Sequence, residues 1–342
     1  MRNYLLVGII TLNFFHCATK IEKQNTKKTI ESDYTIAFGS CNKQNKKNIL
    51  WKEISKNNPD LWVWGGDIIY SDTEDMNKMK EDYDTQINQE GYKVLRKNTP
   101  ILATWDDHDY GVNDGGTEFP KKKQAQELFL NFLGVAKDSP RRNKEGIYHS
   151  ELIKTQKGDI KIILLDTRYF RTPLKKAEGK KRYVPNAYGE GTLLGQKQWT
   201  WLKNELKNSS AEFNIIVSSI QVLSSEHGFE TWGNFPHEVD QLKNTILNSK
   251  SKGVLLLSGD RHISEFSQTT VEGLPYFLTD FTSSGLTHSY SKFDGEPNQY
   301  RKQEVVHDIS FGLLRFNFKE RNITLEMRGK NNKLQQKMKQ TY

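Results

Sequence analysis

Six short apolar runs recur along the chain, and each of them ends in polar or ionisable residues. Continuous runs of about four to eight apolar residues are typical of strands that are buried on both faces. We therefore predict six buried strands, in the segments TIAFGS (35–40), LWVWGG (61–66), ILATW (101–105), KIILL (161–165), FNIIVSSI (213–220) and VLLLSG (254–259).

Helix-like segments lie between these runs. In the last of them Val239, Leu242 and Ile246 recur at helical spacing. Strands that alternate with helices predict an α/β fold, in which ligands bind at the carboxyl ends of the strands. The predicted helices cover residues 48–57, 121–134, 195–208 and 237–250.

The pattern changes after residue 263, where shorter strand-like pieces are separated by turns. We expect these pieces to form a second sheet that packs on the first within one domain. The loop at 289–304 is polar and is expected to be exposed. The predicted pieces are EFSQTTV (265–271), LPYFLTDF (274–281), ISFGLLRFNF (309–318) and NITLEMRG (322–329).

Residues 1–17 predict a signal peptide. Arg2 precedes an apolar stretch from Tyr4 to Phe15, which is too short to span a bilayer but typical of a signal-peptide core. Cys17 follows directly, so a lipoprotein signal with a lipid anchor at Cys17 is one interpretation, and a plain export signal is the other. Residues 18–33 predict a linker and 34–342 the folded domain. Export implies a periplasmic or cell-surface location, membrane-anchored if Cys17 is lipidated.

Charge and cysteine content narrow the classes of protein further. The 342 residues contain 50 Lys plus Arg and 42 Asp plus Glu, a net charge of +8, and only two cysteines. Two cysteines exclude a disulfide scaffold and a tetra-cysteine zinc module. The basic residues are scattered rather than striped, so no nucleic-acid partner is indicated, and no motif indicates a protein partner. If Cys17 is lipidated, Cys41 is the remaining thiol.

The polar residues at the ends of the runs suit metal binding. Carboxylates favour calcium, magnesium or manganese, whereas a thiolate, a phenolate and an imidazole favour a transition metal such as iron. Both kinds of donor occur here, which predicts a mixed multi-metal site. Two close cations can clamp the oxygens of a phosphoryl transfer and activate a water or oxide nucleophile.

Five motifs stand in order along the chain: FGSC (38–41), GGDIIY (65–70), TWDDHDYGVNDGG (104–116), LLDTRYFR (164–171) and SGDRH (258–262). Together they resemble the ordered motifs of the PhoD-like (alkaline phosphatase D) family of calcineurin-like metallophosphatases. The resemblance implies a four-layer α/β/β/α sandwich with two central mixed sheets. It also implies a phosphomonoesterase or phosphodiesterase that uses Fe³⁺ and Ca²⁺.

The same resemblance implies a role for each matching position. Cys41 matches a thiolate ligand of iron, Asp67 the aspartate that bridges the metals, and Tyr70 the tyrosine that binds iron. The three further metal ligands that it implies are Asp107, Asp260 and His262.

Two residues are implied to act on the substrate. His108 matches the histidine that stabilises charge or protonates the leaving oxygen. Arg168 is a candidate phosphate clamp, because a guanidinium can hold two phosphate oxygens in one plane, while a salt bridge to Asp166 is the alternative. The general fold has a further histidine ligand after the fifth strand. This chain has Ser218, Ser219 and Gln221 there, and His227 is expected to be a surface-loop residue.

The sequence therefore predicts an exported metal-dependent phosphoesterase, which attacks phosphate mono- or diesters with a metal-activated hydroxide or oxide. One alternative is a phosphodiesterase or phospholipase-type enzyme that acts on glycerophosphate polymers or phospholipids. The other is a tethered binding lipoprotein without turnover.

Overall fold

Two β-sheets lie face to face in the computed structural model, which describes residues 32–342. The predicted signal peptide and the predicted linker up to residue 31 lie outside the described residues. Ser32 and Asp33 already contact the domain, since the Asp33 carboxylate accepts a hydrogen bond from the Phe318 N–H at 2.8 Å.

The first sheet has six strands: β1 (Tyr34–Gly39), β2 (Leu61–Gly65), β3 (Ile101–Thr104), β13 (Phe311–Asn317), β14 (Asn322–Arg328) and β15 (Leu334–Thr341). They lie in the order β15-β14-β13-β1-β2-β3. β1, β2 and β3 are parallel to one another, and the remaining pairs are antiparallel.

The second sheet has seven strands: β4 (His149–Lys154), β5 (Asp159–Leu164), β8 (Phe213–Val217), β9 (Val254–Ser258), β10 (Ser264–Thr269), β11 (Leu278–Ser283) and β12 (Arg301–Val306). Their order is β12-β10-β11-β9-β8-β5-β4. β5, β8, β9 and β11 are parallel neighbours. A short separate hairpin joins β6 (Lys175–Lys176) to β7 (Tyr183–Val184).

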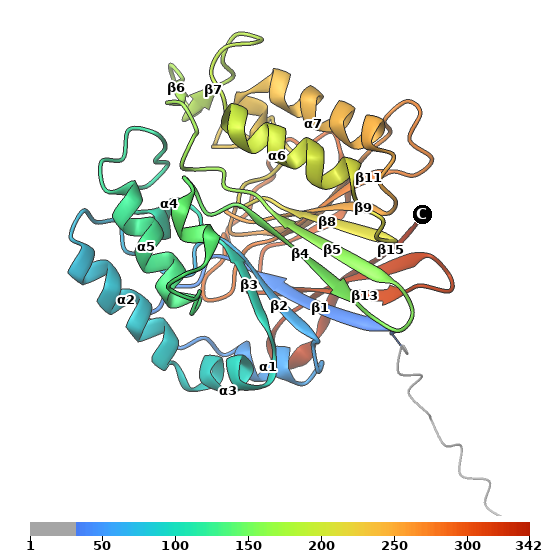
Figure 1. Cartoon of the computed structure of the whole chain (residues 1–342), viewed down its shortest axis with the longest axis horizontal. Helices are drawn as coiled ribbons and strands as arrows, with labels where there is room; N and C mark the ends of the chain where they lie inside the picture. Colours follow the sequence, from blue (N-terminus) through green and yellow to red (C-terminus); the bar gives the residue numbers. More distant parts are fainter. Residues whose placement is uncertain (1–31) are drawn as a thin grey trace, which may run out of the picture. The chain divides into compact units, whose positions relative to one another are not determined.

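Helices cover the outer faces of both sheets, which completes the predicted four-layer sandwich (Figure 1). On the second sheet lie α6 (Gly195–Lys207) and α7 (Pro236–Ser249). The first sheet is covered by α1 (Trp51–Ser55), α2 (Met76–Asn88), α3 (Glu90–Asn98), α4 (Asp107–Tyr110) and α5 (Lys122–Phe132). Three short 3₁₀ helices are η1 (Pro140–Asn143), η2 (Trp232–Asn234) and η3 (Lys330–Asn332). No helix within residues 32–342 is long and apolar enough to cross a bilayer.

The alternation of side chains along each buried strand divides the core into layers. In β2, Val63 packs between the sheets, whereas Trp62 and Trp64 pack under the helices. This is why the run LWVWGG is apolar at every position: successive side chains point to opposite faces, and both faces are buried. Within the first sheet, the Phe38 ring lies over its partner residue on β13, Gly312, where a Cβ would come 2.0 Å from the ring.

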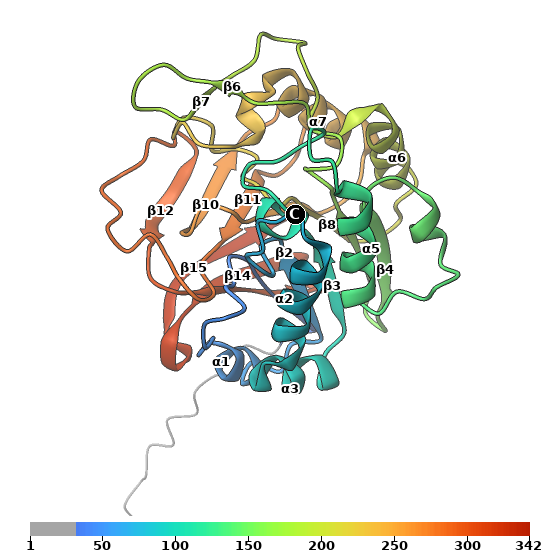
Figure 2. The ribbon, with the colours of Figure 1, turned by 90° about the vertical axis from the view of Figure 1, so that its left-hand side faces the viewer.

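The C-terminal strands depart from the prediction in their pairing. The predicted pieces at 265–281 and 309–329 are strands, but they do not form a sheet of their own. β10 and β11 extend the second sheet beside β9, whereas β13 and β14 extend the first sheet beside β1. The polar edge strands β12 and β15 lie next to each other where the sheets meet (Figure 2), and the Gln303 side chain donates to the Lys337 carbonyl at 3.1 Å.

Candidate metal centre

The predicted ligands lie where parallel strands of both sheets end. Cys41 follows β1 across Ser40, Asp67 follows β2 across Gly66, and Asp260 follows β9 across Gly259. Asp107 comes shortly after β3 and begins α4. Since the carboxyl ends of these strands meet at one edge, residues far apart in sequence are brought together.

Four of these residues have a left-handed backbone. The φ angles are 59° at Cys41, 52° at Asp67, 67° at Asp260 and 56° at His262. Non-glycine residues adopt this conformation rarely, at a cost of about 1–3 kcal/mol each, and such residues cluster at functional sites. The tight turn after each strand directs the side chain back across the strand ends.

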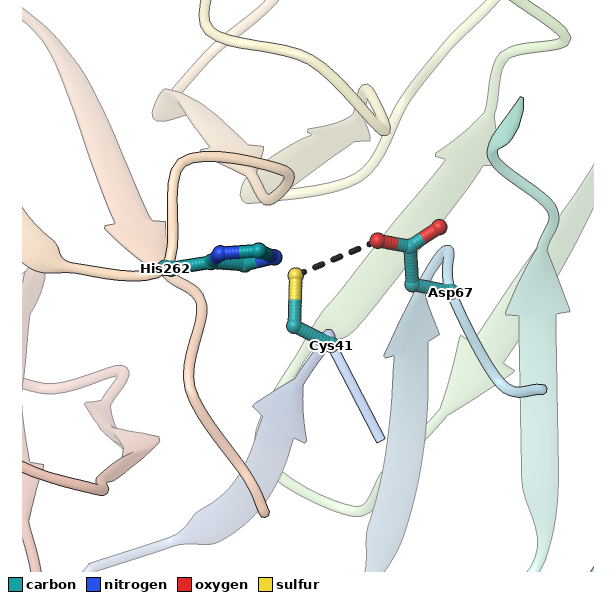
Figure 3. A group of neighbouring side chains, drawn as sticks. All are labelled: Cys41, Asp67 and His262. Carbon is teal, nitrogen blue, oxygen red and sulfur yellow. Dashed lines mark hydrogen bonds between the residues drawn. The ribbon is translucent and has the colours of Figure 1, made fainter. Parts of the chain in front are cut away.

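One group of donors contains sulfur, nitrogen and oxygen (Figure 3). The Cys41 Sγ lies 3.2 Å from Oδ2 of Asp67, and the Tyr70 hydroxyl donates to the same oxygen at 3.1 Å. The Tyr70 hydroxyl also lies 3.0 Å from Nε2 of His262. Burial, and then the charge of Asp260, raises the pKa of the Cys41 thiol to about 11. A bound cation reverses that balance, because it favours the thiolate.

A second group contains only carboxylates and shares Asp67 with the first. One oxygen from each of Asp67, Asp106, Asp107 and Asp260 lies within 4.8 Å of the others. Burial, followed by the Cys41 charge, raises the pKa of Asp67 well above its usual range, and burial with Asp107 raises that of Asp260 to about 6.

Within this group, Asp67 lacks a full set of partners. Oδ1 of Asp67 is buried and accepts no hydrogen bond, although its other oxygen has two partners. Buried carboxylates that repel one another and leave an oxygen unpartnered fit a cation. The residues therefore fit metal binding, with soft and hard donors on either side of Asp67.

His108 is held from two sides. Its Nδ1 lies 2.7 Å from Oδ2 of Asp72, and its ring stacks on Tyr70 with centroids 4.0 Å apart. Burial alone would lower the pKa of His108, but the charges of Asp67 and Asp107 and the bond to Asp72 raise it to about 11. Asp72 was not predicted, and it has a left-handed φ of 44°.

Arg168 does not lie where a phosphate clamp is needed. Its side chain is fully buried, and it is not among the residues that line the pocket. Nε donates to Asp106 at 2.6 Å and Nη1 to Glu230 at 2.5 Å. The alternative partner Asp166 instead accepts hydrogen bonds from the backbone N–H of Arg168 and from Trp105 Nε1. This geometry favours a positioning role, in which Arg168 fixes Asp106 beneath the carboxylate group.

The site opens into a pocket of about 250 Å³. Its inner wall includes Asp107, His108, Asp260 and His262. The buried Glu230 also lines it, and its outer wall is formed by the more exposed residues Asn113, Asp114, Arg182, Phe229, Arg261 and Tyr290. Asn113 and Asp114 bring the segment after α4 into the pocket, and Asp114 is bound there by Arg182 at 2.8 Å.

The segment after β8 has a structural role in place of the missing histidine. The Ser219 hydroxyl donates to Oδ1 of Asp106 at 2.7 Å, and Gln221 donates to Glu265 at 2.7 Å. His227 is largely buried rather than a surface residue, and its Nδ1 accepts from the Phe229 N–H at 3.1 Å. Burial, with Arg261 nearby, lowers the pKa of His227 to about 3.

Ser284 and His288 were also missed by sequence reasoning. The Ser284 hydroxyl lies 3.0 Å from the Cys41 Sγ and accepts from the His262 N–H at 2.8 Å. The His288 ring lies edge-on to Tyr70 and to His262, with centroids 5.1 and 4.5 Å away. Both follow β11, so the rule that strand ends carry the site would have found them had it been applied to LPYFLTDF.

Comparison with known proteins agrees with this arrangement. A model of the family described as PhoD-like phosphatase matches residues 36–328. Alkaline phosphatase D of Bacillus subtilis (strain 168) is 23% identical over 304 residues, which cover 73% of this chain and 51% of that protein. The chain thus spans about half the length of this curated relative.

Solved structures share the fold. The structure of PhoD matches with a TM-score of 0.72 and 19% identity, covering 86% of this chain and 65% of that one. GAP50, the anchor in the inner membrane complex of Plasmodium, matches with a TM-score of 0.58 and 14% identity, covering 90% of this chain and 88% of that one. The family match covers most of the described domain, and the chain belongs to the PhoD-like phosphatase family.

Proposed function

We propose that this protein is a metal-dependent phosphoesterase that hydrolyses phosphate mono- or diesters. The observation that carries the proposal is the shared carboxylate of Asp67. It lies between a group with Cys41 and His262 and a group of buried carboxylates, and His108 is beside both. Membership of a phosphatase family supports the same reaction class.

We further propose Fe³⁺ and Ca²⁺ as the metals. Cys41, Tyr70 and His262 supply the thiolate, phenolate and imidazole that suit ferric iron, and Asp107 and Asp260 supply oxygens that suit calcium. Asp67 would bridge the two. When bound, the metals supply an activated oxygen nucleophile and neutralise charge on the phosphate.

The protein side chains supply the proton. The Nδ1 of His108 is occupied by Asp72, so its Nε2 is the atom that can donate to the leaving oxygen. Asp72 is not one of the proposed metal ligands, and its hydrogen bond with Nδ1 favours the protonated ring. Tyr70, stacked on the imidazole, fixes the plane of the ring. General acid catalysis of this kind contributes about 10²- to 10⁴-fold to a rate.

Export, and a lipid anchor at Cys17, remain part of the proposal. They rest on the sequence of residues 1–17 alone. Labelling with a radioactive fatty acid, in wild type and in the Cys17→Ser variant expressed in a bacterium that processes lipoproteins, tests the anchor. Label that persists in the variant would contradict it.

The reaction is tested with p-nitrophenyl phosphate and bis(p-nitrophenyl) phosphate. Protein purified without chelator is expected to hydrolyse at least one of them, and chelator is expected to stop turnover. The ratio of the two rates separates a monoesterase from a phosphodiesterase, and glycerophosphate polymers and phospholipid vesicles extend the diester series. No turnover on any of these by metal-loaded protein would favour the tethered binding protein instead.

A further inference from the structure

Two aromatic rings are exposed on the outer wall of the pocket. Phe229 is 38% exposed and Tyr290 is 43% exposed, and both line the pocket that contains His108 and His262. They come from different loops, one between β8 and η2 and the other between β11 and β12. Apolar surface that is left uncovered at the mouth of a polar pocket is a contact surface for the organic part of a ligand.

Backbone hydrogen bonds fix the loop segments that carry the two rings. The Tyr290 N–H donates to the His262 carbonyl at 2.8 Å, which ties Tyr290 to a candidate metal ligand. The carbonyl of Gly228, next to Phe229, accepts from the N–H groups of Arg182 and Tyr183 at 2.9 Å each. Rings that are already ordered lose little entropy when a ligand binds, so their contact area contributes efficiently to affinity.

Arg261 adds a third flat group beside these rings. Its guanidinium carbon lies 4.0 Å from the Phe229 ring centroid, and Nη2 donates to Oε1 of Glu296 at 2.6 Å. The other arginine of the outer wall, Arg182, is paired with Asp114 at 2.8 Å. Both cations already have carboxylate partners, so this wall offers flat faces rather than unpaired positive charge.

We propose that Phe229, Tyr290 and Arg261 form a binding site for a planar aromatic ring on the alcohol part of the phosphoester. The enzyme then prefers nucleoside or aryl-bearing esters to glycerol or sugar phosphates. This substrate class rests on the function proposed above for the same pocket. These three residues line the same pocket as His108, Asp260 and His262, so a phosphate at the inner wall places its alcohol group against them. Aromatic rings and guanidinium planes stack on flat rings of any kind.

The test uses a matched pair of substrates, adenosine 5′-monophosphate and ribose 5-phosphate, which have the same kind of leaving alcohol and differ in the base. Wild type is expected to show a kcat/KM at least about tenfold higher for the nucleotide, in line with stacking of one base. Phe229→Ala and Tyr290→Ala are each expected to lower kcat/KM more for the nucleotide than for ribose 5-phosphate and so to remove most of this preference. Phe277→Ala is the matched control, because Phe277 is 51% exposed and lies outside this pocket.

Equal kcat/KM for the two substrates in wild type, or an unchanged preference in both variants, would overturn the inference. So would a loss in Phe229→Ala that is confined to phospholipid in vesicles, since the rings would then contact a membrane. If no phosphoester is turned over at all, the proposed function fails. The ring site is then tested alone by calorimetric binding of the same two compounds to metal-loaded protein, where tighter binding of the nucleotide supports it and equal binding contradicts it.

Discussion

The imidazole of His108 is paired with the carboxylate of Asp72, with 2.7 Å between Nδ1 and Oδ2. This pair couples the predicted acid to a residue on the loop after β2, five positions beyond Asp67. The Asp72 side chain is 42% exposed and that of His108 16%. Asp72 therefore lies at the solvent edge of the site, with the imidazole between it and the metal centre.

We expect Asp72→Asn to reduce kcat by about tenfold to a hundredfold, because the imidazole loses the partner that fixes its proton on Nδ1. Removing the carboxylate also lowers the pKa of His108. Since the protonated form is the acid, the fall in activity at high pH is expected to begin at a lower pH. A pH–rate profile checks this, with Asp84→Asn on the exposed face of α2 as the control. An unchanged alkaline limb would falsify the coupling.

Metal removal is expected to abolish activity and to lower the thermal unfolding temperature by about 5–10 °C, because the buried carboxylates then repel one another. Both effects should be reversed by adding back the metals found by elemental analysis. Scanning calorimetry of chelator-treated and reloaded protein provides the measurement. A melting temperature that does not respond to chelator would mean that the carboxylate group holds no ion.

Cys41→Ser is expected to lose bound iron or to shift its visible absorption, because thiolate and phenolate ligands colour ferric iron. Tyr70→Phe keeps the ring that stacks on His108 but removes the phenolate, so it should weaken the colour while the fold is retained. Absorption spectra and iron content of the two variants test the ligand set. Colourless wild-type protein that holds only zinc would contradict the iron assignment.

Arg168 forms buried ion pairs with Asp106 and Glu230, so replacing it is expected to destabilise the fold. Arg168→Met leaves Asp106 as a buried carboxylate without a cation and Glu230 with Arg171 alone, so we expect a loss of about 3–5 kcal/mol in the free energy of unfolding. Lys80→Ala, which breaks the exposed pair with Asp84, should cost less than about 0.5 kcal/mol. Urea denaturation measures both. A similar loss of unfolding free energy in the two variants would show that the buried ion pairs stabilise the fold no more than the exposed pair does.

His149, which is not part of the candidate metal centre, makes the free energy of unfolding depend on pH. Burial, with Arg141 and Lys144 nearby, lowers its pKa to about 3. The unfolded chain then binds a proton below about pH 6.5 that the folded chain rejects, so this contribution to stability falls as the pH drops from 6.5 toward 3. Relative to His149→Phe, wild type should lose roughly 1 kcal/mol per pH unit at the steepest point. Urea titrations at several pH values test this, and an equal pH dependence in wild type and His149→Phe would contradict it.

The sequence allowed the six apolar strands to be predicted because both faces of each are buried, which leaves an unbroken apolar run. The edge strands β12 and β15 were not predicted, since RKQEVV and LQQKMKQT have no such run. Which sheet each C-terminal strand joins depends on pairing between distant segments, as in Ile36 opposite Leu314. No local pattern carries that information.

The same limit applied within the site. The predicted metal ligands follow strands closely in the sequence, so they could be predicted from the ends of the apolar runs. Asp72 and Glu230 are brought in by loops, and their roles depend on the partners they meet in space. Arg168 illustrates the difference: the motif LLDTRYFR suggested a phosphate clamp, but the guanidinium meets Glu230, which lies 62 residues away.

The left-handed backbone at Cys41, Asp67, Asp260 and His262 positions the candidate metal ligands but lowers the stability of the domain. Glycine adopts this conformation at little cost, so Asp67→Gly in metal-free protein removes both backbone strain and a buried charge. Such a variant is expected to melt at a higher temperature than metal-free wild type while being inactive, and a lower melting temperature would contradict this. A chain of this fold that had lost its catalytic role could therefore accumulate glycine or asparagine at these four positions and become more stable as it did so.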